Sequence, residues 1–346
     1  MKRIKSLDLL KFIMAILIVF HHYQQNTGMR GQYINFYEGT IYWGSLVELF
    51  FIISGFLSAI GIDRIAEQDF KSFITKKIIR IYPMAMLSIL VMTVAGFAYV
   101  VVWGKWYAGV RITIWKLWNS LLLTVTGGAV NDGFGINGAL WYLCVLMYCY
   151  VIMYFIIWFC KRKEINCVYG FAIMSILGLS LLQYEIKLPF LNEYTGRGYS
   201  AFFLGIILYY IWNAVCHKYL MIYSLSVLFI CIIVYFGAYS LFAANMREMM
   251  TYIIFPAILF LTLAADKISD IALLKKTEPG GMAYEMYLWH GCGICIWMIL
   301  SKKWGFIDLS NYCMMFVFTL IIILFSAVMY HLVEKRITVL LKKKIS

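Results

Sequence analysis

Apolar runs about twenty residues long recur along this chain, and they constrain its fold more than any other feature. The hydrocarbon core of a bilayer is about 30 Å thick, and a helix needs roughly 20 apolar residues to cross it. Because ten runs come close to this length, the sequence predicts an all-α, polytopic transmembrane helical bundle of about ten spans. The predicted spans are 7–24, 42–62, 80–103, 139–160, 168–184, 200–213, 219–240, 250–265, 282–301 and 311–333.

The composition excludes several classes of protein. Hydrophobic residues make up 63% of the 346 residues and charged residues 14%. In soluble domains about 45–50% of the residues are apolar and about 25% are charged. So few charges cannot cover the surface of a soluble enzyme, and the apolar content is too high for a disordered chain. The net charge of +13 therefore does not indicate a nucleic-acid partner, and we expect a lipid bilayer around the chain.

One segment differs from the predicted spans. Residues 108–126 have a polar, basic face and an apolar face, which indicates an interfacial or re-entrant helix. The glycine-rich residues 127–138 after it are expected to form a loop. No linker or change of composition marks a second domain, so residues 1–346 are predicted to form a single integral membrane domain with no appended soluble domain.

Basic residues are distributed unequally between alternate loops. If the N-terminus is cytoplasmic, one side of the membrane collects 20 Lys and Arg residues and the other side nine. Cytoplasmic loops carry the excess of basic residues, so both termini are predicted to be cytoplasmic. The same charges favour contact with anionic lipids.

The first predicted span contains Asp8, Lys11, His21 and His22. Ionisable groups at membrane depth are costly, and each is a functional candidate. Lys11 and His22 are eleven residues apart, so they lie within about 20° of each other around the helix, while His21 lies about 80° away. If one face of the helix lines a cavity, we expect His22 on it and not His21. The alternative is an Asp8–Lys11 ion pair at the start of the helix and a hydrogen-bonded His22 at the interface.

The second predicted span contains a single charged residue, Glu48. It is expected at a depth similar to that of His22, and a carboxylate beside an imidazole fixes its tautomer and stabilises its protonated form. The alternative is a structural polar contact between adjacent helices. Gly44 and Gly55 on the same span would allow close helix packing.

Three cations, Lys76, Lys77 and Arg80, precede Pro83 where a helix re-enters the bilayer. They could bind the phosphates of a nucleotide-like donor, or they could anchor the helix on the cytoplasmic side.

Polar and aromatic residues also enter the membrane later in the chain. The stretch NGALWYL (137–143) places Trp and Tyr at the interface, and YEMYLWH (284–290) places His290 near the midplane, where an unpaired polar ring is costly. Cys292 and Cys295 lie close to His290, but no second pair of ligands accompanies them. We therefore expect no metal site.

Several of these stretches form ordered blocks that resemble the motifs of the acyltransferase 3 family. The blocks are SLDLLKFIMAILIVFHH, VELFFIISGFLSA, KIIRIYP, NGALWYL and YEMYLWH. This family consists of integral membrane acyltransferases that O-acylate bacterial cell-surface carbohydrates and other hydroxyl acceptors, and the resemblance covers nearly the whole chain. In two departures from the motifs, lysine replaces arginine at positions 11 and 77, which keeps the charge but loses the planar guanidinium fork.

The resemblance implies catalytic and donor-binding residues. His22 would be the catalytic histidine, and Glu48 would orient it. The donor would be an acyl-CoA, with acetyl-CoA expected, and it would bind from the cytoplasm at Lys11, Lys77 and Arg80. No cofactor would be bound permanently.

The resemblance also implies an acceptor and a setting. The acceptor would be a hydroxyl group of a cell-surface polysaccharide or lipid-linked sugar, and the protein would be a multi-pass O-acetyltransferase of the bacterial inner membrane. The residues on the acceptor side would be Asn137, Trp141, Tyr287 and His290.

Two other functions stay open. A proton-coupled transporter or flippase would use Lys11, Glu48 and His22 as a proton relay, although the sequence has no visible internal repeat of the kind common in transporters. A non-catalytic membrane assembly subunit would tolerate substitution of its histidines, but it fits the family blocks poorly.

Overall fold

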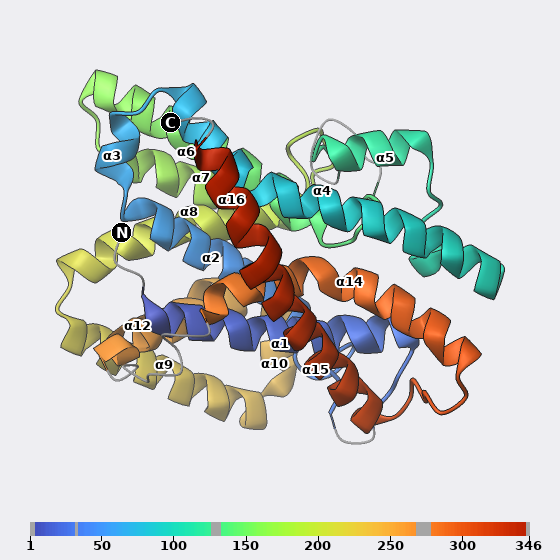
Figure 1. Cartoon of the computed structure of the whole chain (residues 1–346). Helices are drawn as coiled ribbons and strands as arrows, with labels where there is room; N and C mark the ends of the chain where they lie inside the picture. Colours follow the sequence, from blue (N-terminus) through green and yellow to red (C-terminus); the bar gives the residue numbers. More distant parts are fainter. Residues whose placement is uncertain (1–3, 32–33, 126–132, 268–277, 344–346) are drawn as a thin grey trace. The chain divides into compact units, whose positions relative to one another are not determined.

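The computed structural model describes residues 4–31, 34–125, 133–267 and 278–343, and within these ranges the chain forms helices and no strand (Figure 1). The prediction of an all-α fold is confirmed. Part of the predicted loop 127–138 lies outside the described residues, as do several of the counted basic residues, among them Lys275 and Lys276.

The helices are named in chain order, and Figure 1 labels most of the α-helices. They are α1 (Lys5–Thr27), η1 (Trp43–Ser45), α2 (Leu46–Ala59), α3 (Ile62–Ala66), α4 (Phe70–Trp103), η2 (Tyr107–Gly109), α5 (Ile114–Leu121), α6 (Leu140–Lys163), α7 (Cys167–Gln183), α8 (Glu193–Ala214), α9 (His217–Gly237), α10 (Tyr239–Ala244), α11 (Met246–Met249), the π-helical η3 (Met250–Ile254), α12 (Phe255–Ala264), η4 (Ala265–Lys267), α14 (Pro279–Lys303), α15 (Tyr312–Val328), the π-helical η5 (Met329–Glu334) and α16 (Lys335–Lys343).

Each predicted span coincides with helical residues, and six helical stretches among the described residues are long and apolar enough to cross a membrane. These are Lys5–Thr27, Phe70–Trp103, Leu140–Lys163, His217–Gly237, Met246–Ala264 and Tyr312–Lys343. The apolar helices Trp43–Ala59 and Cys167–Gln183 are shorter. The structure therefore indicates a multi-pass membrane protein, while the count of ten spans and the cytoplasmic termini stay predictions.

The chain divides into two compact units, each assembled from segments that are distant in the sequence. The first unit comprises Met1–Lys11, Thr40–Ile74 and Val145–Pro279, and the second unit comprises Phe12–Gly39, Thr75–Cys144 and Gly280–Ser346. The single domain expected from the composition stays a prediction.

In the first unit, α8 packs closely against α2 and α7 because small residues lie at the contacts. A Cβ atom at Gly55 would clash with the Phe202 carbonyl, and one at Gly205 would clash with the Ile52 carbonyl. Gly178 is equally close to the backbone of Ser200. Small residues allow helix backbones to approach in a membrane, and the prediction for Gly55 is confirmed.

In the second unit, α14 is joined to α4 and α15. The Tyr284 hydroxyl donates to the Ile81 carbonyl at 2.9 Å, and the Trp103 indole donates to the Met298 carbonyl at 3.2 Å. Gly293 leaves room for Ile322 of α15. These bonds satisfy polar side chains that would be costly to leave unpaired.

The predicted interfacial segment 108–126 contains a shorter helix than expected. Helix α5 begins after Thr113, whose hydroxyl accepts a hydrogen bond from the Lys116 amide, and it ends at Leu121. Its buried residues are Asn119 and Ser120, while its exposed side chains include Ile114, Trp115 and Trp118. Eight residues cannot span a bilayer, and the exposed apolar face suits a helix lying at the membrane surface.

Replacing Gly205 with alanine should destabilise the first unit, because the new methyl group meets the backbone of α2. We expect the free energy of unfolding to fall by about 1–3 kcal/mol, measured by thermal unfolding of the detergent-solubilised protein. Gly237→Ala is the matched control, since no atom lies within 4 Å of the added Cβ. Equal stability of the two variants would contradict the close α2–α8 contact.

Candidate active site

The imidazole rings of His22 and His290 stack in the second unit. Their centroids are 4.9 Å apart and their planes differ by 18°. His22 lies in the second half of α1 and is half-buried, whereas His290 lies in the middle of α14 and is buried. The structure thus brings together the predicted catalytic residue and a predicted acceptor-side residue from segments far apart in the sequence.

Two tyrosine rings follow next to His290, tilted or edge-on and not stacked face to face. The ring of Tyr287 on α14 lies 5.8 Å from that of His290, and the ring of Tyr142 on α6 lies 5.2 Å from that of Tyr287. Tyr287 is therefore beside His290, and its acceptor-side role stays a prediction.

Gln25 is a site residue that the sequence reasoning missed. The His22 Nδ1 atom and the Gln25 Oε1 atom are 2.7 Å apart, and an amide oxygen can only accept, so Nδ1 carries the proton. The ring nitrogen with the lone pair is then Nε2. The signal was present in the sequence, because residues three apart face each other on a helix.

His21 lies edge-on beside His22, with ring centroids 5.0 Å apart, and has a hydrogen-bond partner of its own. It is buried, and its Nδ1 atom donates to the Phe36 carbonyl at 2.7 Å. The neighbouring Gln24 side chain binds the same stretch through the Phe36 amide and the Ile34 carbonyl. His21 and Gln24 therefore bind residues 34–36 to α1 through hydrogen bonds.

Glu48 lies in the first unit, where it forms a buried bidentate ion pair. Its two oxygens accept from Nε and Nη2 of Arg197 at 2.7 Å and 2.9 Å, and Nη2 also donates to the Gly44 carbonyl. This is the structural contact between adjacent helices that was the alternative to a partnership with His22. The orienting role of Glu48 stays a prediction.

Arg197 falls in the gap between the predicted spans 168–184 and 200–213, but it is helical. Helix α8 begins at Glu193, because Asn192 and Thr195 form a capping box one turn before the apolar run. Such caps satisfy the first amides of a helix. Arg197 consequently lies inside the helix and is buried.

The predicted donor-binding cations fall in two places. Lys11, in the first unit, pairs with Asp8 at 2.6 Å, which matches the alternative given for it. Lys77 and Arg80 lie one turn apart on α4 in the second unit, with Lys77 half-buried and Arg80 exposed.

Asn137 holds three parts of the second unit together. Its Nδ2 donates to the Ser88 hydroxyl at 3.1 Å and to the Leu288 carbonyl at 3.0 Å, and its Oδ1 accepts from the Ala139 amide. Asn137 is fully buried and Trp141 is buried beside the start of α6. The observed contacts of Asn137 are structural, and its acceptor-side role stays a prediction.

Cys292 belongs to the same region, since its thiol lies 3.6 Å from the Ser88 carbonyl. Within the described ranges, no group of three or more His, Cys, Asp or Glu side chains is placed to hold a metal ion.

Comparison with known proteins gives a match to a family of acyltransferases. A family profile described as Acyltransferase domain matches residues 4–331, which is nearly the whole chain. No curated protein and no solved structure matches the chain.

Removing Arg197 should be far more damaging than removing an exposed arginine. In Arg197→Met the Glu48 carboxylate would be buried without its partner, which costs about 3–5 kcal/mol of stability. Arg247→Met is the matched control, because the Arg247–Glu193 pair is 3.2 Å long and more exposed, and such pairs contribute about 0–1 kcal/mol. Thermal unfolding in detergent distinguishes the two, and similar losses would show that the buried pair is not a major stabilising contact.

Proposed function

The chain belongs to the acyltransferase 3 family and is a membrane acyltransferase, and we propose that it transfers an acyl group from acyl-CoA to a saccharide hydroxyl. The observation that carries this proposal is the arrangement of His22, with Gln25 on one ring nitrogen and His290 stacked against the ring. Acetyl-CoA is the simplest donor, and the acceptor is a cell-surface polysaccharide or a lipid-linked sugar.

In this proposal His22 is the general base. Gln25 holds the proton on Nδ1, so that Nε2 takes the proton of the acceptor hydroxyl as its oxygen attacks the thioester carbonyl. The new C–O bond forms, the C–S bond breaks, and the imidazolium returns the proton to the coenzyme A sulfur. His290 and Tyr287 restrict the orientation of the His22 ring and form one wall of the reaction site.

The contacts between α4 and α14 allow an estimate of the distance from the donor-binding cations to the histidines. Arg80 is next to Ile81, whose carbonyl accepts a hydrogen bond from Tyr284 of α14. Ser88 contacts Cys292, which follows His290 by two residues, so Ser88 lies close to His290 along α14. Eight residues of α4 separate Arg80 from Ser88, about 12 Å along the axis. Phosphates bound at Lys77 and Arg80 would therefore leave an extended thioester arm to reach the histidines.

The proposed setting is a bacterial inner membrane with both termini in the cytoplasm and the donor entering from that side. Lys11 is retained as a further candidate for the donor phosphates. Lysine at positions 11 and 77 supplies a point charge in place of a bidentate fork, so these contacts would be less directional than in relatives with arginine.

Replacing His22 with alanine should abolish acyl transfer, because general-base catalysis contributes about 10²–10⁴-fold to rate. The measurement is transfer of labelled acetyl from acetyl-CoA to glycan by the protein in proteoliposomes. His217→Ala is a matched control, since His217 stacks on Trp212 at 3.9 Å in the first unit. Acetyl transfer by His22→Ala at the rate of the unsubstituted protein would contradict the mechanism. Saccharide uptake into the proteoliposomes without acetyl transfer would favour the transporter.

Replacing Lys77 and Arg80 together with alanine should raise the KM for acetyl-CoA tenfold or more while kcat changes little. Hydrogen bonds to charged groups contribute about 1.5–3 kcal/mol, and these two residues are assigned to the phosphates and not to the chemistry. Lys76→Ala, which removes a neighbouring exposed cation, is the control variant. An unchanged donor KM in the double variant would assign the pair to membrane anchoring.

A further inference from the structure

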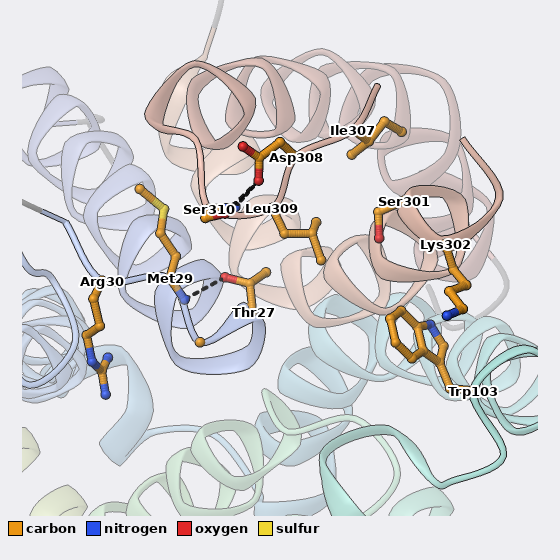
Figure 2. Close-up of a pocket in the computed structure, with 11 residues that line it drawn as sticks. Thr27, Met29, Arg30, Trp103, Ser301, Lys302, Ile307, Asp308, Leu309 and Ser310 are labelled. Atoms are coloured by element: carbon orange, nitrogen blue, oxygen red, sulfur yellow. Dashed lines mark hydrogen bonds between the residues drawn. The ribbon is translucent and has the colours of Figure 1, made fainter. Parts of the chain in front are cut away.

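A polar hollow lies in the second unit where α1, α4 and α14 end, and its volume of about 510 Å³ is within the range of small-molecule sites. We propose that this hollow, called here the α1–α4–α14 hollow, binds an uncharged saccharide unit of the acceptor. The inference rests on the proposed function and adds where the acceptor is bound and that the bound unit carries no charge. The side chains that carry the argument are Thr27, Trp103, Ser301, Lys302, Asp308 and Ser310 (Figure 2).

Trp103 and Lys302 form a positioned donor group. The Trp103 indole is fixed by its hydrogen bond to the Met298 carbonyl, and the Lys302 ammonium lies 5.1 Å from the centre of the indole ring. The cation–π contact restrains an otherwise flexible side chain. The three N–H donors of the ammonium are thereby held at the wall of the hollow, where sugar oxygens can accept hydrogen bonds from them.

Asp308 and the hydroxyl groups supply acceptors. The Ser310 amide and hydroxyl both donate to Asp308 Oδ1, which holds the pKa of this carboxyl below its usual range and keeps it an acceptor at neutral pH. Thr27 and Ser301 donate their protons to carbonyls of their own helices. The Thr27 oxygen also accepts from the Met29 amide, so it offers one lone pair and the Ser301 oxygen offers two. Sugar hydroxyls, which both donate and accept, match this mixture.

The charges of the lining residues favour an uncharged ligand. Lys302 and Asp308 have opposite signs, and Figure 2 shows them on different sides of the hollow. The remaining cation, Arg30, is bonded to Glu38. A phosphate would meet the Asp308 carboxylate without a surplus of positive charge, whereas a neutral polyol meets donors and acceptors in balance.

The hollow is close to His22 and distant from the donor cations. Thr27 follows His22 by five residues on α1, about 7.5 Å along the axis. Trp103 follows Arg80 by 23 residues on α4, about 34 Å along that axis. A saccharide with one ring in the hollow would extend a neighbouring hydroxyl toward His22, while the donor phosphates would lie at the other end of the same helix.

The test is a binding measurement on the detergent-solubilised full chain by ligand-observed NMR. The probes are the methyl glycosides of glucose, galactose, mannose and N-acetylglucosamine, with methyl glucuronide and inorganic phosphate as charged alternatives. We expect at least one uncharged glycoside to bind, and Asp308→Asn and Lys302→Met each to weaken its binding at least tenfold. Lys303→Met, an exposed neighbour outside the lining, should bind as the unsubstituted protein does.

Failure to bind any uncharged glycoside would overturn the proposal, as would equal binding by all three variants. Tighter binding of methyl glucuronide or phosphate would assign the hollow to an anion instead. Asp308 and Lys302 are exposed, so gel filtration should show their variants folded. The two proposals fail separately. Acyl transfer by His22→Ala would contradict the mechanism, and equal glycoside binding by the unsubstituted protein, Asp308→Asn and Lys302→Met would contradict the hollow.

Discussion

A polar group within the hydrocarbon of a bilayer has to be satisfied by the protein itself, and this constraint organises the whole molecule. Backbone groups meet it by forming helices, and side chains meet it by reaching neighbouring helices. Asn137 binds Ser88 and Leu288, and Glu48 binds Arg197. Each buried polar side chain that joins segments distant in the sequence is therefore also a constraint on how those segments pack.

The histidine pair illustrates how such constraints produce a site. His290 lies two residues after Leu288, whose carbonyl receives the Asn137 amide, so the loop before α6 fixes the register of α14. On α1, His21 and Gln24 hold the following loop and leave His22 on another face, against His290. The structural polar residues thus set the position of the candidate catalytic ring.

Function in the proposed scheme is distributed along α4. Its first half carries Lys77 and Arg80. Ser88 in its middle binds Asn137, which also binds α14 two residues before His290. Its last residue, Trp103, restrains Lys302 at the hollow. The proposed reaction brings together a charged nucleotide-bearing donor and a polar acceptor whose chemistries differ. A long helix with different polar groups at its two ends provides that separation.

The sequence by itself determined the all-α class, the largely helical course of the predicted spans and the membership of the family. The first two follow from hydrophobic run length, which is a local property, and the family follows from the ordered motif blocks. Only the tertiary structure decided that Glu48 meets Arg197, that α5 is as short as Ile114–Leu121, and that His22 stacks on His290. Periodicity gives the face on which a side chain lies, but partners 149 or 268 residues apart in the chain are chosen by packing, which no local pattern encodes.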